Sequence, residues 1–171
     1  MQNTKNPLIF VVIESSIYND LVVGYLKSKK YKNIKAFHSG IECLNYRKQV
    51  PDIVVLSYSM EVMNGLDIMQ KIKNEHHDVD FFFLSGQNDV SIGVSIIKAG
   101  AFDYIVKNDK ALNKLSRSIE NAIYITKAIK IRKGYKIGVI GFFIILLIII
   151  LIILSLTIFF PDDFSFQLGM I

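Results

Sequence analysis

Short apolar runs alternate with helical patterns along the first two thirds of the chain. These runs are rich in β-branched or aromatic residues and cover positions 8–13, 34–37, 53–56, 81–84 and 104–106. Their length and composition are typical of β-strands. Because they are apolar almost throughout, rather than at every second position, we expect strands that helices cover on both faces. Such strands form a parallel sheet in an α/β domain.

The segments between these strands are expected to form helices of about ten to fourteen residues. Ser16 is a candidate N-cap of the first helix and Ser39 of the second, because a hydroxyl can accept a hydrogen bond from a free backbone N–H of the first turn. Gly65 follows Asn64 and should open the third helix, while residues 99–101 should close the fourth.

A fifth helix should begin near Asp109 and pack on the sheet through an apolar stripe. The stripe has helical spacing and consists of Leu112, Leu115, Ile119, Ala122 and Ile123. Gly134 is the expected joint to the next segment. That segment, residues 137–160, carries no charge and holds twenty Ile, Leu, Val or Phe residues among its 24. As a helix it would measure about 36 Å, enough to cross a hydrocarbon core of roughly 30 Å.

The distribution of charge suggests how such a span would be oriented. Five basic and no acidic residues lie between Lys127 and Lys136, whereas Asp162 and Asp163 follow the apolar segment. The positive-inside rule places the basic side in the cytoplasm. The predicted organisation is therefore a domain over 1–126, a basic juxtamembrane linker over 127–136, a single transmembrane helix over 137–160 and a short extracytoplasmic tail over 161–171.

Composition narrows the function classes further. The chain carries a net charge of +5, but residues 1–126 hold 15 basic against 13 acidic residues, which argues against a nucleic-acid partner. The basic cluster beside the apolar segment suits anionic membrane lipid instead. No signal peptide is expected at the N-terminus. The single cysteine, Cys43, cannot form an internal disulfide and is expected to be a small buried apolar residue.

Three separated motifs carry a resemblance to a known family. The segments PDIVVLSYSMEVMNGLDIMQKIK, FFFLSG and KAGAFDYIVK each contain the end of a predicted strand, where an open parallel sheet gathers its reactive groups. Together they resemble the receiver domain of bacterial two-component response regulators, over about residues 7–124. The resemblance implies a (βα)5 flavodoxin-like fold, a doubly wound parallel sheet.

The resemblance also assigns roles to individual residues. Lys107 matches the lysine that the family places after its fifth strand, and Ser85 matches the Ser or Thr after the fourth. Tyr104 matches the family's switch aromatic. Met60 and Gly65 fit the turn that follows the acceptor strand. These positions retain the receiver pattern.

Other positions depart from it. Ile13 and Glu14 stand where the family has two acids, and Ser57 replaces the phosphoacceptor aspartate. Glu61 and Asn108 replace two prolines. Phosphoryl transfer needs a carboxylate nucleophile and oxygen ligands for Mg²⁺, so we expect no phosphate transfer, no metal site, no cofactor and no enzymatic activity. We also expect Lys107 to pair with Glu14 and to hold one fixed conformation.

Function is then expected to lie in binding. The resemblance implies a face for protein partners, or for a homodimer, on the fourth helix, fifth strand and fifth helix, with Val90, Lys98, Tyr104, Lys114 and Glu120 as candidates. The favoured interpretation is a scaffolding module in signal transduction. The alternative is a sensor that binds a small anion or nucleotide in the vacated pocket. A Ser57–Lys107 nucleophilic pair is the remaining enzymatic interpretation.

Overall fold

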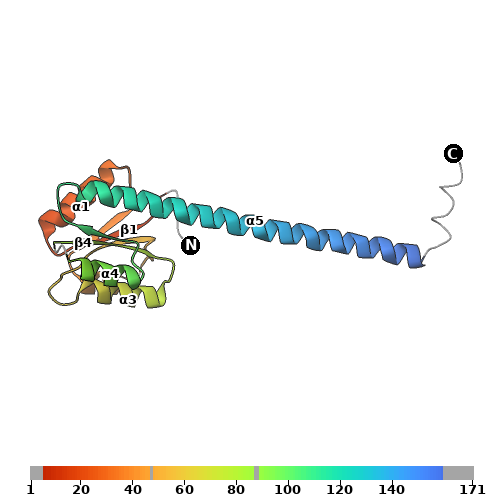
Figure 1. The fold of residues 1–171 in the computed structure, drawn as a ribbon, viewed down its shortest axis with the longest axis horizontal. Coiled ribbons are helices and arrows are strands. Elements are labelled where there is room, and N and C mark those ends of the chain that lie inside the picture. Colours follow the sequence, from red (N-terminus) through yellow and green to blue (C-terminus); the bar gives the residue numbers. More distant parts are fainter. Residues whose placement is uncertain (1–5, 47, 87–88, 160–171) are drawn as a thin grey trace. The chain divides into compact units, whose positions relative to one another are not determined.

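The computed structural model describes residues 6–46, 48–86 and 89–159. Five strands alternate with five helices (Figure 1). The strands are β1 (Ile9–Val12), β2 (Ile34–Phe37), β3 (Ile53–Ser57), β4 (Asp80–Ser85) and β5 (Asp103–Val106). The helices are α1 (Ser16–Ser28), α2 (Gly40–Asn45), α3 (Gly65–Glu75), α4 (Val90–Lys98) and α5 (Ala111–Phe159). All five expected strands are confirmed to within a residue at each end.

The five strands form one parallel sheet in the order β2-β1-β3-β4-β5. Every strand therefore ends at the same edge, which we call the carboxyl edge, and begins at the opposite amino edge. This arrangement confirms the doubly wound parallel sheet that the apolar runs predicted. The order reverses at β1, so β1 and β3 lie in the centre and their ends face the crevice where such folds place their chemistry.

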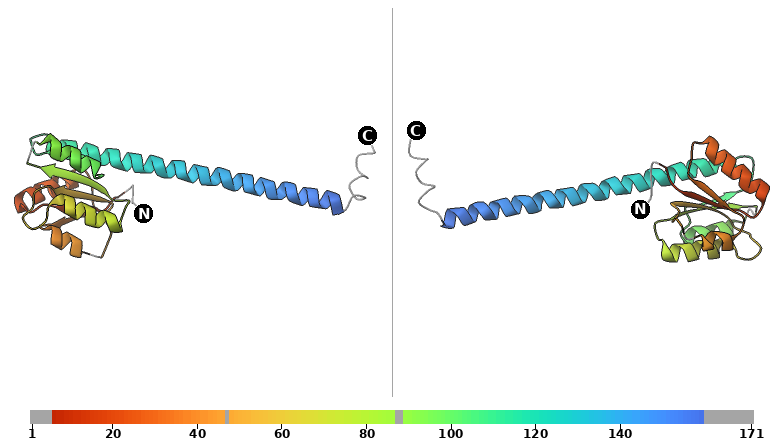
Figure 2. Two further views of the ribbon diagram at one scale, coloured as in Figure 1. Left: turned by 60° about the horizontal axis from the view of Figure 1, so that its bottom comes forward. Right: turned by 180° about the vertical axis from the view of Figure 1, so that it is seen from behind.

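Helices cover both faces of the sheet, as the near-continuous apolarity of the strands required. Phe82 packs on the face covered by α1 and α5, whereas Phe81 and Phe83 pack on the face covered by α2, α3 and α4. All three phenylalanine side chains are fully buried. Figure 2 shows the same division of the helices from two further directions. Alternate residues of one apolar run thus supply two separate cores.

The helix ends follow the expected chemistry with two corrections. Ser39 caps α2, and α3 begins at Gly65 with Asn64 as its cap. For α1 the expected cap Ser16 is wrong, because the hydroxyl of Ser15 accepts the bond from the N–H of Tyr18. Two helices are also shorter than expected, at six residues for α2 and nine for α4.

Helix α5 differs most from the expectation. The apolar stripe is confirmed, with Leu115, Ile119 and Ala122 buried and Leu112 and Ile123 packed against the same core. The helix does not end in the basic linker, however, but continues to Phe159. Glycine at position 134 is compatible with a helix, at a modest cost, so its presence does not impose a joint.

The chain divides into two units, residues 1–126 and 127–171. Within the part of the chain that the structure describes, no helix has both the length and the hydropathy needed to cross a membrane. The expected span over 137–160 is therefore not supported here and stays a proposal. The expected tail over 161–171 and residue 160 lie outside the described residues, as do the side chains of 130–138, 140 and 157–159.

Cys43 is 3% exposed and packs with the core beneath α2 and α3, which confirms the expected apolar role. Burial, with a smaller contribution from the charge of Glu42, raises the pKa of the Cys43 thiol to about 12. The side chain is therefore a neutral thiol at physiological pH. Its chemistry is that of a small core residue.

The turn after α1 places a lysine in an unusual backbone conformation. Lys30 has φ 70°, the left-handed region in which glycine is favoured at the end of a helix. Its N–H donates to the carbonyl of Lys27 at 2.9 Å, and the N–H of Tyr31 donates to that of Leu26 at 3.2 Å. This pair of bonds is the Schellman motif, and Lys30 occupies its glycine position.

We therefore predict that Lys30→Gly raises the free energy of unfolding by about 0.5–1 kcal/mol, because glycine removes the steric cost of the left-handed conformation. Urea denaturation followed by circular dichroism measures the change. Lys29→Gly is the matched control, since it removes the same charge at a residue with φ −83°. An equal gain in both variants would mean that charge, not backbone conformation, sets the effect.

Candidate functional site

The expected pocket residues meet at the carboxyl edge of the sheet. Ser57 and Ser85 are the last residues of β3 and β4, and Ile13 and Glu14 follow β1. The N–H of Lys107 donates to the carbonyl of Ser85 at 2.8 Å, which fixes the start of the loop after β5 beside β4. The five residues thus lie at the same edge of the sheet, and their role as one pocket stays a prediction.

Burial divides the five residues into two kinds. Ile13, Ser57 and Ser85 are 1%, 5% and 2% exposed, and we call them the buried residues of the site. Ile13 packs in the core between the sheet and helices α1 and α5. Glu14 and Lys107 are half-buried, and we call them the rim of the site. The buried residues comprise two neutral hydroxyls and one hydrocarbon side chain. None of the three buried side chains carries a carboxylate.

The carboxylate of Glu14 is engaged by the backbone of a neighbouring loop. Its Oε1 accepts a hydrogen bond from the N–H of Glu61 at 2.7 Å. A hydrogen bond to a charged acceptor is among the stronger ones in proteins. It joins the loop after β1 to the loop after β3, and so closes the two central loops on each other.

Lys107 takes a different partner from the one expected. Its Nζ lies 4.4 Å from the centre of the Tyr18 ring, in a cation–π contact. Burial lowers the pKa of the Lys107 ammonium. Among the described residues no ion pair joins Lys107 to Glu14, so that expectation is wrong. The reason is that Glu14 turns to the N–H of Glu61 while Tyr18 covers the ammonium.

Sequence reasoning did not single out Tyr18. Burial raises the pKa of its phenol, so the side chain remains neutral. The signal that could have found it is its position, in the first turn of α1 directly after β1. Among the described residues no hydrogen bond joins Ser57 to Lys107, so the nucleophilic pair is not assembled.

The start of α3 presses closely on the end of β3. A Cβ atom at Gly65 would lie 2.4 Å from the carbonyl oxygen of Ser57 and 2.9 Å from the ring of Phe83. Only glycine, which has no Cβ atom, lets the start of α3 lie this close to the end of β3. The N–H of Gly65 donates to the carbonyl of Tyr58 at 2.9 Å, which fixes the turn that carries Glu61.

A second feature lies between α4 and β5. This feature is a groove that has a volume of about 410 Å³ and is lined mainly by apolar groups. Its charged residues are Asp89, Lys98 and Asp103. The other lining residues are Val90, Gly93, Val94, Ile97, Tyr104 and Val106. Val90, Val94 and Ile97 are 76%, 46% and 44% exposed. A Cβ at Gly93 would lie 3.1 Å from the Tyr104 ring, so glycine lets that ring lie close against α4.

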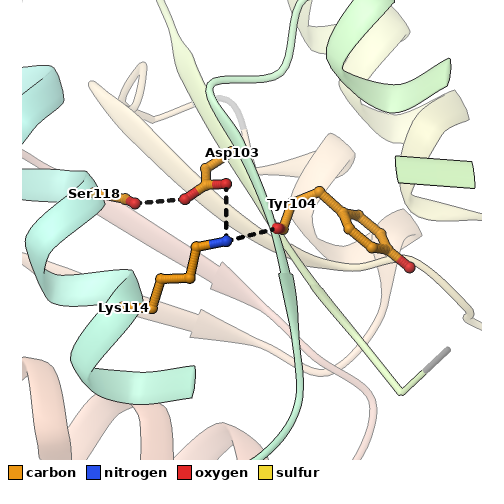
Figure 3. Close-up of polar contacts among 4 residues, drawn as sticks. All are labelled: Asp103, Tyr104, Lys114 and Ser118. Carbon is orange, nitrogen blue, oxygen red and sulfur yellow. Dashed lines mark hydrogen bonds and ion pairs between the residues drawn. The ribbon is translucent and has the colours of Figure 1, made fainter. Parts of the chain in front are cut away.

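Polar contacts join β5 to α5 beside this groove. The ammonium of Lys114 lies 3.4 Å from Asp103 Oδ1 and donates to the carbonyl of Tyr104 at 3.2 Å. The hydroxyl of Ser118 donates to Asp103 Oδ2 (Figure 3). Figure 3 also shows the Tyr104 ring turned away from Lys114. Sequence reasoning missed Asp103 and Ser118, whose partners are distant in the chain.

The structure brings only part of the expected binding face together. Val90 and Lys98 line the groove with Tyr104, and Lys114 lies next to it on α5. Glu120 lies apart from the groove. Burial, with a smaller contribution from the charge of Glu120, raises the pKa of Tyr31 to about 12, and Tyr31 follows α1. Glu120 therefore belongs to the α1 side of α5.

Comparisons with known proteins agree with this architecture. The model of the response regulator receiver domain matches residues 9–120. The luminescence regulatory protein LuxO of Vibrio campbellii is 30% identical over 93 residues, which cover 54% of this chain and 19% of LuxO. The response regulator protein TmoT of Ectopseudomonas mendocina is 27% identical over 106 residues, or 61% of this chain and 48% of TmoT. The chain thus spans about half or less of the length of these relatives.

A solved structure gives the same result. A response regulator receiver domain protein from Clostridium thermocellum superposes with a TM-score of 0.65 at 25% identity, covering 72% of this chain and 98% of that one. The family model matches well over half of the chain, and the sheet order and the site at the carboxyl edge are those that the sequence motifs implied. The chain therefore belongs to the response regulator receiver domain family, which works in two-component signal transduction.

Proposed function

We propose that this receiver domain is a membrane-anchored, phosphorylation-independent module that binds protein partners and has no catalytic activity. The observation that carries the proposal is that buried Ile13 and Ser57 stand at positions that the family fills with acids. Two-component signalling is the family's setting.

The chemistry of the pocket supports independence from phosphate. Mg²⁺ requires hard oxygen ligands at near-octahedral geometry, and Ile13 has no donor atom. Glu14 supplies a carboxylate, but one oxygen already accepts the N–H of Glu61. The hydroxyl of Ser57 is a weak nucleophile without an adjacent base. These residues therefore supply neither the aspartate acceptor nor a full set of ligands for the Mg²⁺ that offsets the negative charge of the phosphoryl group.

The contacts at the rim support a fixed conformation. Lys107 lies over the Tyr18 ring, and Glu14 accepts a hydrogen bond from the N–H of Glu61. A switch needs two states that a ligand binds unequally. Here Lys107 and Glu14 already have partners within the domain. We therefore expect phosphate to cause little change in their contacts.

The groove between α4 and β5 supports binding of a protein partner, which includes a second copy of the chain. Val90, Val94 and Ile97 give α4 an exposed apolar side, and interfaces have such apolar centres with polar rims. Asp89, Lys98 and Asp103 supply the rim. No nucleic acid is required by this account.

Anchoring is supported by the sequence over 137–160 and by exposure along α5. The large apolar side chains from Phe142 to Leu154 are between 43% and 62% exposed. A continuous apolar surface of this length needs a cover, and lipid is the cover that the flanking charges favour. The basic side of the segment would then face the cytoplasm.

The phosphorylation prediction is direct. Incubation of the full chain with acetyl phosphate and Mg²⁺ is expected to leave its intact mass unchanged, because Ser57 stands in place of the acceptor aspartate. A receiver domain with its aspartate, treated in parallel, is the positive control. A phosphorylated species of this chain would overturn the proposal, and a rise in melting temperature with inorganic phosphate alone would favour the sensor.

The partner prediction compares two exposed apolar positions. A photo-crosslinking amino acid at Val94, in the groove, is expected to capture protein in membranes at several times the yield of the same group at Leu21 on α1. Leu21 is 52% exposed, against 46% for Val94, so exposure is matched. Gel shifts and mass spectrometry measure the yields. Equal capture at the two positions would contradict a partner site in the groove.

The anchoring prediction uses fractionation of cells that express the full chain. The chain is expected to remain in the membrane pellet after alkaline carbonate, because about twenty apolar residues insert favourably by several kcal/mol in total. A variant lacking residues 137–160 should move to the supernatant. If the full chain is itself extracted by carbonate, it is not anchored as proposed.

A further inference from the structure

Four lysines gather at the turn between α1 and β2. Lys27, Lys29, Lys30 and Lys32 are all exposed, and we call them the lysine cluster. No acidic residue occurs in the sequence between Asp20 and Glu42. Among the described residues none of the four forms an ion pair. The cluster is therefore a concentrated positive charge on a domain whose charges otherwise nearly balance.

The cluster lies at the amino edge of the sheet, where β2 begins. Helix α5 starts beyond the end of β5 and runs back toward this edge, because it packs on the same core as Tyr31 through Ile119 and Ala122. The hydroxyl of Tyr25 donates to Asn113 at 2.6 Å and fixes α1 against α5. Residue 126, the end of the first unit, is thus on the edge that carries the cluster.

Acidic groups of the same edge are set apart from it. Asp52 and Asp80 stand at the starts of β3 and β4, two and three strands from β2 in the sheet. Asp52 accepts a hydrogen bond from the N–H of Leu8 at 2.8 Å. Glu120 is the acid that acts on the turn itself, through Tyr31. It leaves most of the cluster's charge uncompensated.

Lys30 adds an independent observation. It occupies the glycine position of the turn, at φ 70°, where its side chain carries a steric cost. A residue that is unfavourable for the local fold is often explained by what it contributes elsewhere. A fourth positive charge on this edge is the contribution that the structure offers.

We infer that the lysine cluster binds anionic lipid headgroups of the membrane that residues 137–160 enter. The inference rests on the proposed anchoring. The chain continues from this edge into five basic residues over 127–136 and then into the apolar segment. Tyr124, 74% exposed, and Ile125, 48% exposed, precede them. Tyrosine is enriched where protein meets the headgroup region, and lysines there are attracted to anionic lipid.

Lipid fits these features better than nucleic acid. A nucleic-acid site needs charge spread along a groove or helix, often with aromatic groups for stacking. The cluster is instead confined to one turn beside the membrane-proximal end of the domain. Binding would orient the amino edge toward the membrane and leave the pocket edge, with Lys107 and Glu14, open to partners.

The test measures the accessibility of individual lysines. The full chain is reconstituted in vesicles of neutral phosphatidylcholine, or of phosphatidylcholine with phosphatidylserine, and labelled briefly with an amine reagent. Peptide mass spectrometry then gives a rate for each lysine. The cluster is expected to react about threefold more slowly in the anionic vesicles, since each lysine near the surface gains on the order of a kcal/mol. Lys110, at the carboxyl edge, should react equally in both.

Matched variants identify the groups responsible. Lys27→Gln with Lys30→Asn should abolish most of the protection of Lys29 and Lys32, whereas Lys71→Gln with Lys110→Gln should leave it intact. Equal labelling of the cluster in the two kinds of vesicle would overturn the inference. So would equal protection in neutral vesicles by inorganic phosphate at matched ionic strength, or stronger protection by an RNA oligonucleotide.

The same experiment separates this inference from the anchoring. Retention of the chain in neutral vesicles reports the anchor alone. If the chain leaves neutral vesicles but binds anionic ones with the cluster protected, the lysine inference holds and the anchor fails. If it stays in both and the cluster reacts equally, the anchor holds and the inference fails.

Discussion

Complete burial of the central strands is the constraint on which the rest of this structure depends. Residues of β1, β3 and β4 alternate between two cores, so neither face of the sheet can carry polar chemistry. Function is left to the two edges and to the outer surfaces of the helices. At the carboxyl edge the loops meet around Ser57 and Ser85. At the amino edge the turns carry lysines and the chain leaves the domain.

The two charged residues of the site make their contacts within the domain. Glu14 joins two loops through the N–H of Glu61, and Lys107 lies on Tyr18. Both contacts lie at the carboxyl edge of the sheet and join residues far apart in the sequence. In this account the residues that would respond to phosphate in a switch instead hold the loops in place. In the proposed function, the groove between α4 and β5 is the site that a partner contacts.

Sequence patterns were sufficient for the sheet and for the positions of the pocket residues. Apolar runs identify buried strands, and a parallel sheet brings the strand ends together, so Ile13, Ser57 and Lys107 could be placed before any coordinates were known. What the sequence could not provide was the direction of side chains. Whether Lys107 turns to Glu14 or to Tyr18 depends on loop geometry of a few ångströms. The contact between Asp103 and Ser118 spans fifteen residues and has no periodic signal.

The end of α5 shows a different limit. Glycine and a basic run are typical of a linker, yet neither prevents a helix, and α5 continues through both. The sequence alone likewise did not identify the lysine cluster after α1. Its significance depends on the fold, which places these lysines at the same edge of the sheet as residue 126.

The central claim is that the site does not respond to phosphorylation. Nuclear magnetic resonance spectra of the backbone amides test this claim most directly. The full chain in detergent micelles would be titrated with Mg²⁺ and then with beryllofluoride, which mimics a phosphoryl group on an acceptor carboxylate. The account predicts no saturable shift at the amides of Ser85, Tyr104 and Lys107. A saturable shift at these three positions would mean that the pocket still binds the ligands of an active receiver, and would contradict the account.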